Sequence, residues 1–131
     1  MAEIFAADSV NNTATTTIAT TTETVVVTGN FISPPYGNAK AVIMGTVDIA
    51  TGTGTVFLTF RIRRNPGAEN VVVLQQLDST PAPNTALRGF QVADAIPDGR
   101  AVQYQVSVQQ NAATANGSVA FANVTVLLIS G

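Results

Sequence analysis

The stretch Val119-Ala120-Phe121-Ala122-Asn123-Val124-Thr125-Val126-Leu127-Leu128-Ile129 has the composition of a β-strand that is apolar on both faces. Side chains of a strand point alternately to its two sides, so one set contains Phe121 and Leu127 and the other contains Val124 and Val126. A strand in a single-sided antiparallel sheet should be polar where it meets water. A strand that is apolar on both sides needs a second covering surface, and we expect another copy of the chain to supply it.

This expectation places an oligomer interface on one side of the last strand. The residues predicted to form it are Val124, Val126 and Leu128, and Phe57 joins them from a strand expected to face this one. We therefore predict that the protein associates with itself through an apolar sheet face.

The rest of the chain also has a strand pattern, in which Val, Thr, Ile and Phe alternate with polar residues between regularly spaced turns. The alternation is clearest in segments 40–50, 56–63 and 101–110. The turn sequence Thr51-Gly52-Thr53-Gly54 separates the first two, so we predict that they pair as a hairpin. The Thr-rich tract 13–28 is predicted to form two exposed strands, because β-branched Thr favours strands.

The number and spacing of these segments predict an all-β, single-domain antiparallel β-sandwich, a jelly roll of about 8 to 10 strands. The last strand is expected in the middle of one sheet. An immunoglobulin-like sandwich fits less well, because the chain has no Cys and no Trp. Residues 13–131 are expected to form the sandwich, and residues 1–12, with Ile4 and Phe5, an N-terminal arm or an edge strand.

The composition of the chain argues against nucleic-acid binding and against enzyme activity. The chain of 131 residues is 46% hydrophobic and 11% charged, with a net charge of −2 and six basic residues. So few cations do not support nucleic-acid binding, which depends on many phosphate contacts. The chain has no His and no Cys, which are the commonest general base and thiol nucleophile. We expect no enzyme activity and no cofactor, and the sequence shows neither a transmembrane run nor a signal peptide.

Two acidic residues near a turn, Asp94 and Asp98, are the only close carboxylate pair. Paired carboxylates act in glycoside hydrolysis, and carboxylate oxygens also bind calcium. Asp is common in turns next to Pro and Gly, and Arg100 follows closely with a positive charge. We interpret the pair as part of a loop and assign no catalytic or metal site.

Three further residues are candidates for contact with a ligand or partner. Arg61 and Arg63 lie on one strand face, where they would bind a carboxylate, phosphate or acidic sugar, or else form an ion pair with an acid such as Asp48. Tyr36 lies in the loop Phe31-Ile32-Ser33-Pro34-Pro35-Tyr36, where it is placed to stack on a sugar or a partner protein.

The chain resembles compact jelly rolls of the tumour-necrosis-factor/C1q-like type in three respects. It has a Cys-free series of short Val- and Thr-rich strands. It contains Gly89-Phe90-Gln91-Val92 followed, after a Pro-Asp-Gly turn, by Val102-Gln103-Tyr104-Gln105-Val106, and it closes with Gly117-Ser118-Val119-Ala120-Phe121 and Val124-Thr125-Val126-Leu127-Leu128. The resemblance covers most of the chain from about Val25 onward. It implies a trimer packed along a threefold axis, as in modules of phage decoration and fibre proteins and of bacillus spore surfaces.

The sequence thus predicts a non-enzymatic structural protein, a homo-oligomeric jelly roll that decorates or builds the surface of a virion or other particle. One alternative is a subunit of an extracellular filament, in which the arm with Ile4 and Phe5 completes the sheet of the next subunit. Another is a glycan-binding lectin module that uses Tyr36, Arg61 and Arg63. The expected partners are further copies of the chain and a capsid or particle surface, with a glycan in the lectin alternative, and no nucleic acid or membrane.

Overall fold

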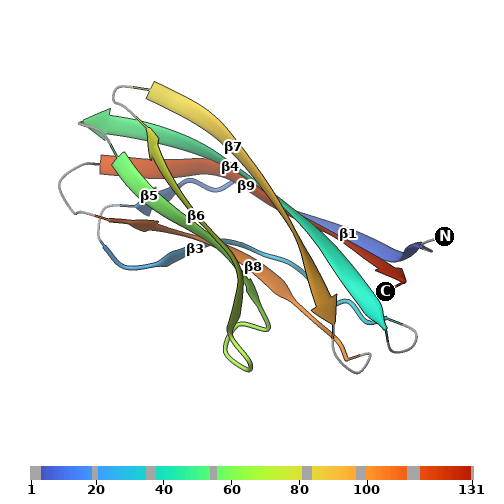
Figure 1. The fold of residues 1–131 in the computed structure, drawn as a ribbon. Coiled ribbons are helices and arrows are strands. Elements are labelled where there is room, and N and C mark those ends of the chain that lie inside the picture. The colour runs from blue at the N-terminus through green and yellow to red at the C-terminus, as the bar shows by residue number, and fades with distance from the viewer. Residues whose placement is uncertain are drawn as a thin grey trace.

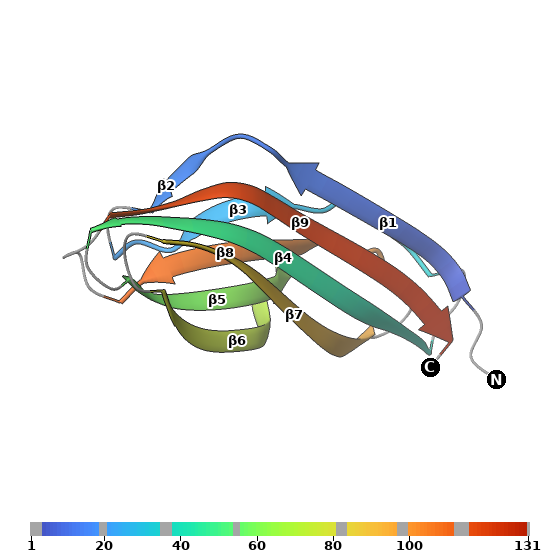
Figure 2. The ribbon, with the colours of Figure 1, turned by 90° about the horizontal axis from the view of Figure 1, so that it is seen from above.

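The computed structural model describes residues 4–18, 21–34, 38–53, 56–80, 84–96, 100–111 and 116–130. These residues form two antiparallel layers (Figures 1 and 2). The first sheet has the order β1-β9-β4-β7, with β2 also paired to β9, and the second has the order β3-β8-β5-β6. The strands are β1 (Ile4–Asn12), β2 (Thr16–Ile18), β3 (Thr24–Thr28), β4 (Ala39–Thr53), β5 (Val56–Arg64), β6 (Val71–Thr80), β7 (Asn84–Ile96), β8 (Tyr104–Gln110) and β9 (Asn116–Ser130).

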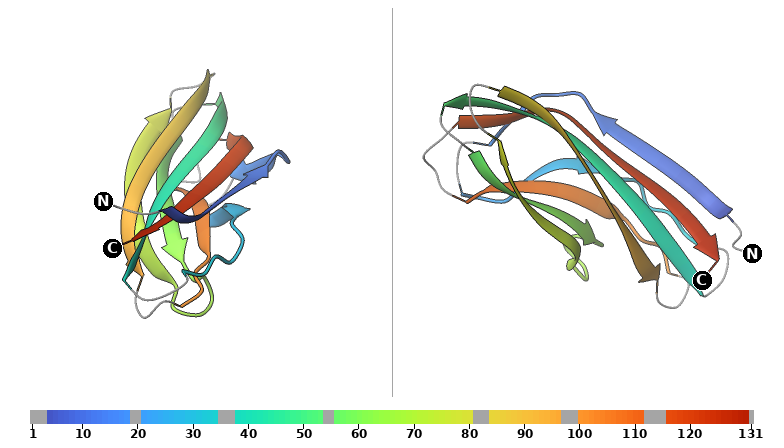
Figure 3. Two further views of the ribbon diagram at one scale, coloured as in Figure 1. Left: turned by 90° about the vertical axis from the view of Figure 1, so that its right-hand side faces the viewer. Right: turned by 45° about the horizontal axis from the view of Figure 1, so that its top comes forward.

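This strand order is that of a jelly roll, because the first strand pairs with the last and most connections cross between the two layers. Between β3 and β9, only β5 and β6 are neighbours both in sequence and in a sheet. The predicted antiparallel β-sandwich is therefore confirmed, and so is the inner position of β9, which lies between β1 and β4. Both chain ends lie at the same end of the sandwich (Figure 3). No helix long enough to span a membrane occurs among the described residues.

The predicted hairpin between segments 40–50 and 56–63 is wrong. Both strands form, but β4 pairs with β7 and β9 in the first sheet, whereas β5 pairs with β6 and β8 in the second. Alternation shows that a strand has one buried face, but it does not show which sheet the strand joins. Strands of both sheets bury one face in the same core. The hairpin in this region is β5–β6, whose turn contains Asn65 and Gly67 at positive φ angles of 46° and 88°.

The core lies between the layers and is lined by the side chains that the alternation predicts to face inward. On β8, the inward positions Tyr104, Val106 and Val108 are completely buried. The same holds for β4 and β5, where the inward side chains are at most 2% exposed: Ala41, Ile43, Val47, Ile49, Leu58, Phe60 and Ile62.

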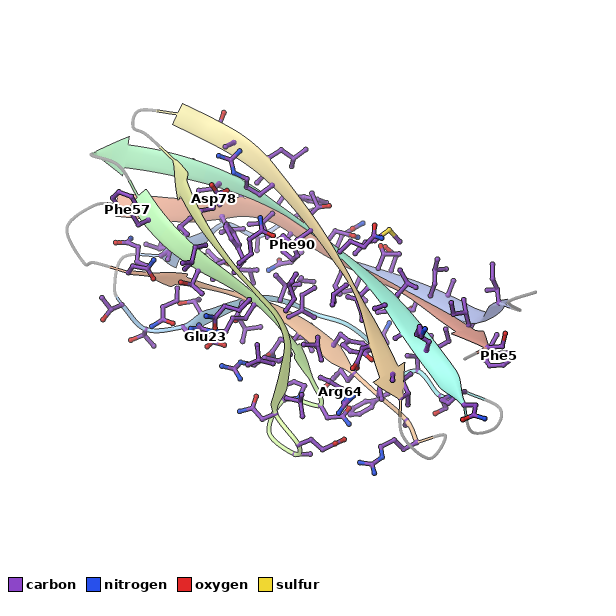
Figure 4. All side chains as sticks on the ribbon, in the orientation of Figure 1. Phe5, Glu23, Phe57, Arg64, Asp78 and Phe90 are labelled. Carbon is purple, nitrogen blue, oxygen red and sulfur yellow. The ribbon has the colours of Figure 1, made fainter. Side chains whose placement is uncertain are left out.

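Phe90 occupies the middle of this core because the residue opposite it is glycine. Gly45 on β4 pairs with Phe90 on β7, and a Cβ added to Gly45 would lie 2.2 Å from Cε2 of Phe90. The Phe90 ring, labelled in Figure 4, packs against Phe60 of the second sheet, at 5.7 Å between ring centroids. A Cβ on the neighbouring Gly89 would have its nearest atom 4.0 Å away. Only the first of these two glycines is therefore required by packing.

Gly45→Ala is expected to destabilise the protein by about 1 to 3 kcal/mol, because the added methyl group must displace the Phe90 ring from a packed core. Gly89→Ala is the matched control and should change stability by no more than about 0.5 kcal/mol, as is usual for surface substitutions. Denaturant unfolding of the two variants measures the difference. Equal destabilisation by both substitutions would contradict this account of the core.

Candidate interaction surface

The outer face of the first sheet carries little charge. It consists of the side chains that alternate with the buried ones on β1, β9, β4 and β7. Among the described residues of this face, only Lys40 and Asp48 are charged. Its remaining members are Ile4, Ala7, Ser9, Asn11, Val42, Met44, Thr46, Ala50, Thr85, Leu87, Gly89, Gln91, Ala93, Ala95, Ser118, Phe121, Asn123, Thr125, Leu127 and Ile129.

Strand pairing gathers the apolar side chains of this face at its two ends. At one end Leu127 pairs with Val42, and Ile129 lies one row further out, beside Lys40. At the other end Phe121 and Leu87 lie on either side of Asp48. A band of smaller and uncharged side chains separates the two ends, so each end presents a charge next to apolar surface.

A shallow depression of about 390 Å³ lies within this central band. It is present because Gly89 has no side chain at an outward position. Met44, Thr46 and Gln91 form its rim, and Phe90 is one of the residues that line it from the core side. The depression has room for one side chain of a molecule covering the sheet.

The residues predicted to form the oligomer interface lie on the other side of β9. Val124, Val126 and Leu128 are 1%, 3% and 0% exposed in the single chain, because the second sheet covers them. The prediction is corrected accordingly: these residues belong to the core, and Leu127 and Phe121 are on the outward side. The sequence contained a signal for this assignment, since the outward set also holds the polar residues Asn123 and Thr125.

Phe57 lies on the outer face of the second sheet and does not share a surface with the outward side chains of β9. It is 55% exposed, and with Leu77, Asp78 and Asn111 it lines a second depression of about 370 Å³. In Figure 4 it lies at the opposite end of the molecule from Phe5. Phe57 stays a predicted contact residue, but for a surface other than the one formed by β9.

Arg61 and Arg63 lie together on the outer face of the second sheet, and both bind Glu23. Arg61 Nη1 donates to Glu23 Oε1 at 2.9 Å, and Arg63 donates to both carboxylate oxygens at 2.7 and 2.8 Å. Ser107 Oγ adds a fourth hydrogen bond at 2.7 Å. The structure thus contains the ion-pair alternative, with Glu23 as the acid in place of Asp48, which lies on the other sheet.

A second ion-pair network links the end of β5 in the second sheet to β7 in the first. Arg64 Nη1 lies 3.0 Å from both carboxylate oxygens of Asp94, and Tyr104 Oη donates to Asp94 at 2.7 Å. Burial and this neighbouring carboxylate raise the pKa of Tyr104. Asp94 therefore acts as a structural partner of Arg64, and Asp98 lies outside the described residues. The described part of the chain holds no group of three or more potential metal ligands.

Comparisons with known proteins agree with the strand order. No protein-family model and no curated protein sequence matches the chain. Among solved structures, Eiger TNF from S. frugiperda is similar, with a TM-score of 0.59 and 11% identity over 95% of this chain and 92% of that one. The globular domain of zebrafish complement 1qA protein gives a TM-score of 0.50 and 11% identity over 92% of this chain and 94% of that one. The fold is a jelly roll of the tumour-necrosis-factor and C1q type.

The same jelly roll occurs as part of a larger capsid protein. The VP2 subviral particle of infectious bursal disease virus gives a TM-score of 0.52 and 11% identity over 95% of this chain. This chain spans 37% of the VP2 chain. At such low identities the likeness is one of fold, and the function has to be argued from the surfaces of this chain.

The N-terminal segment belongs to the jelly roll itself. From Ile4 to Asn12 it pairs with β9 of the same chain, so the described part of residues 1–12 is an edge strand. Asn12 Nδ2 also donates to the carbonyl oxygen of Val26 at 2.7 Å, which ties β1 to the second layer. The filament alternative would require β1 to leave this position, and it stays a hypothesis. Tyr36, the candidate for stacking, lies outside the described residues.

The contacts of Glu23 have an electrostatic consequence. The hydrogen bond from Arg63 is the largest cause that lowers the pKa of Glu23 from 4.5 to about 2, against the opposing effect of burial. The hydrogen bond from Ser107 and the charges of Arg63 and Arg61 lower it further. The same pairing raises the pKa of Arg63. Glu23 precedes β3, so this cluster fastens the start of β3 to β5.

Glu23→Gln is expected to lower the free energy of unfolding by about 1 to 2 kcal/mol at neutral pH. This is less than the full pKa shift would give, because the ion pair is partly exposed and solvent screens it. A lowered pKa in the folded state stabilises the protein above pH 4.5, and this contribution is lost as the pH falls towards 2. Urea unfolding of the wild type and the variant between pH 7 and pH 2 measures the effect. The gap between them should narrow below pH 4.5, and a constant gap would contradict the assignment. Arg63→Gln, alone and combined with Glu23→Gln, tests whether the loss arises from this pair.

Proposed function

We propose that this protein is a non-enzymatic structural protein whose copies associate through the outer face of the first sheet to build or decorate the surface of a particle such as a virion. The observation that carries this proposal is the near absence of charge on that face, together with the apolar side chains at both of its ends. The likeness of the fold to a viral capsid protein supports a role at a particle surface.

The two outer faces of the sandwich differ mainly in charge. The outer face of the second sheet presents Arg61, Arg63, Gln105 and Gln109, and beside these polar groups it exposes Phe57 and Leu77. The first sheet instead presents half-buried Val42, Phe121, Leu127 and Ile129 with exposed Leu87. Apolar side chains at both ends of a sheet face with so little charge support association through that face.

The charged groups of the chain also support a structural role. Each of the five arginines forms an ion pair: Arg61 and Arg63 with Glu23, Arg64 with Asp94 and Glu69, Arg88 with Asp78, and Arg100 with Glu69. A catalytic acid or base needs access to a substrate and a pKa near the working pH. The carboxylates paired with arginines are already occupied, and two of them, Asp94 and Asp78, link the two sheets.

Light scattering on a sizing column tests the proposal, with Leu127→Asp and Leu77→Asp as matched variants. The wild-type mass should be a multiple of 13.5 kDa. Leu127→Asp, on the outer face of the first sheet, should weaken association at least tenfold, because it places a charge in a covered apolar surface. Leu77→Asp, 68% exposed on the second sheet, should leave the mass unchanged.

The other outcomes are equally informative. A wild-type protein that stays monomeric at all concentrations would overturn the proposal. Dissociation by Leu77→Asp and not by Leu127→Asp would move the interface to the second sheet, near Phe57. Circular dichroism of each variant shows whether the fold is retained, so that a loss of mass can be assigned to the interface.

A further inference from the structure

We infer that the contact between copies is twofold and antiparallel: two copies stack their first sheets face to face, with the two β4 strands running in opposite directions. Lys40 of each copy then pairs with Asp48 of the other. This inference rests on the proposed function, because it assumes that a second copy covers the outer face of the first sheet. It adds the symmetry of the contact and the residues that determine it.

Lys40 and Asp48 are the two described charges of this face, and neither has an ion-pair partner within the described part of the chain. Asp8, the other described charge outside an ion pair, lies at an inward position of β1 and accepts a hydrogen bond from Asn30. All five arginines are paired with carboxylates. Asp48 is also half-buried between Phe121 and Leu87 on the neighbouring strands. A molecule that covers this face must place a cation opposite Asp48 and an anion opposite Lys40, since an unpaired charge in a contact is costly.

Lys40 and Asp48 lie on the same side of β4, eight residues apart, which corresponds to about 26 Å at the usual rise of a strand. The midpoint between them is Met44. A half-turn about an axis that lies midway between the two stacked sheets, parallel to them, perpendicular to β4 and above Met44, reverses the strand direction and turns the face over. It brings Lys40 of one copy above Asp48 of the other at both ends of the contact.

The same rotation matches the neighbouring strands. Ile129, which pairs with Lys40, comes to lie above Phe121, which pairs with Asp48. On β7, Ala95 comes to lie above Leu87. Met44 meets its own copy beside the depression at Gly89, which offers space for its side chain. Sheets stacked in this way are usually about 10 Å apart, a distance at which their side chains interdigitate. At each end of the contact, opposite charges therefore lie above each other, and so do the apolar side chains beside them.

A ring of copies about an axis parallel to β4 would leave Lys40 and Asp48 unpaired. In a ring of copies about an axis parallel to β4, each residue lies at the same height in every copy. Lys40 would then stay about 26 Å from every Asp48 along the axis. Like charges would gather at each end instead. The threefold arrangement implied by the family resemblance is of this kind when its axis follows β4, so the charges favour the twofold contact.

Exchanging the two charges tests the inference. Lys40→Asp and Asp48→Lys, made separately, place like charges opposite each other at both ends of the contact, and each should raise the dimer Kd about tenfold or more. The double variant Lys40→Asp/Asp48→Lys restores opposite charges and should return the Kd to within about threefold of the wild type. Sedimentation velocity measures both the Kd and the mass, which should be twice 13.5 kDa.

Salt and a neutral variant provide the controls. The wild type and the double charge exchange should both dissociate more readily as salt rises from low to high concentration, because salt screens exposed ion pairs. Lys40→Gln/Asp48→Asn keeps side-chain size without charge and should lose most of this salt dependence. Neither position lies in the core, and circular dichroism shows whether each variant is folded.

The outcomes separate this inference from the proposed function. A trimer, or an oligomer whose Kd the double exchange does not restore, would overturn the twofold contact and leave self-association standing. A wild-type monomer would overturn both. Dissociation by Leu127→Asp without any response to the charge exchanges would keep the interface and reject its antiparallel direction. Restoration by the double exchange, with a mass of two chains, supports the inference.

Discussion

The structure depends first on which side of β9 is buried against the second sheet. Because successive side chains of a strand point to opposite sides, burying Val126 and Leu128 sends Leu127 and Ile129 outward, and a slip of one residue would reverse every position. One irregularity modifies this pattern: Asp48 pairs with Phe121 but Ile49 pairs with Val119, so one residue is extra. This β-bulge returns Val119 to the core, where it is 2% exposed. The appearance of two apolar faces in the sequence is thus partly the result of the bulge.

In a chain with few charges, two ion pairs join the two layers. Arg64 and Asp94 connect the second sheet to β7, and Arg88 and Asp78 do the same closer to the β6–β7 turn. Replacing a buried pair such as Arg64–Asp94 by apolar residues is often neutral or stabilising, so a net gain in stability is not expected from it. We interpret its effect as the selection of one alignment of the layers. With the arginines engaged there and at Glu23, the outer face of the first sheet is left with Lys40 and Asp48 alone among its described charges.

The sequence was sufficient to predict the strands, the sandwich and the inward residues of the regular segments such as 101–110. It was not sufficient where the answer depended on contacts between distant parts of the chain. The predicted pairing of β4 with β5 was wrong because alternation does not show which layer the next strand joins. The acid that binds Arg61 and Arg63 was missed because Glu23 lies about 40 residues earlier, and only the pairing of β3 with β8 brings it near β5. The side of β9 was misassigned although Asn123 and Thr125 marked the outward one.

A fold of this type provides a face for association without fixing how two such faces meet. The core would be the same with neutral residues at positions 40 and 48, because neither side chain contributes to the packing between layers. These two side chains make the ends of the face different: Lys40 is positive at one end of β4 and Asp48 is negative at the other. Without them, the two ends would be similar apolar surfaces. A surface with two like ends packs equally well in either direction, whereas one with opposite charges favours the antiparallel arrangement and disfavours the parallel one. In the proposed dimer, the symmetry of the contact is therefore set by two residues that the fold itself does not need.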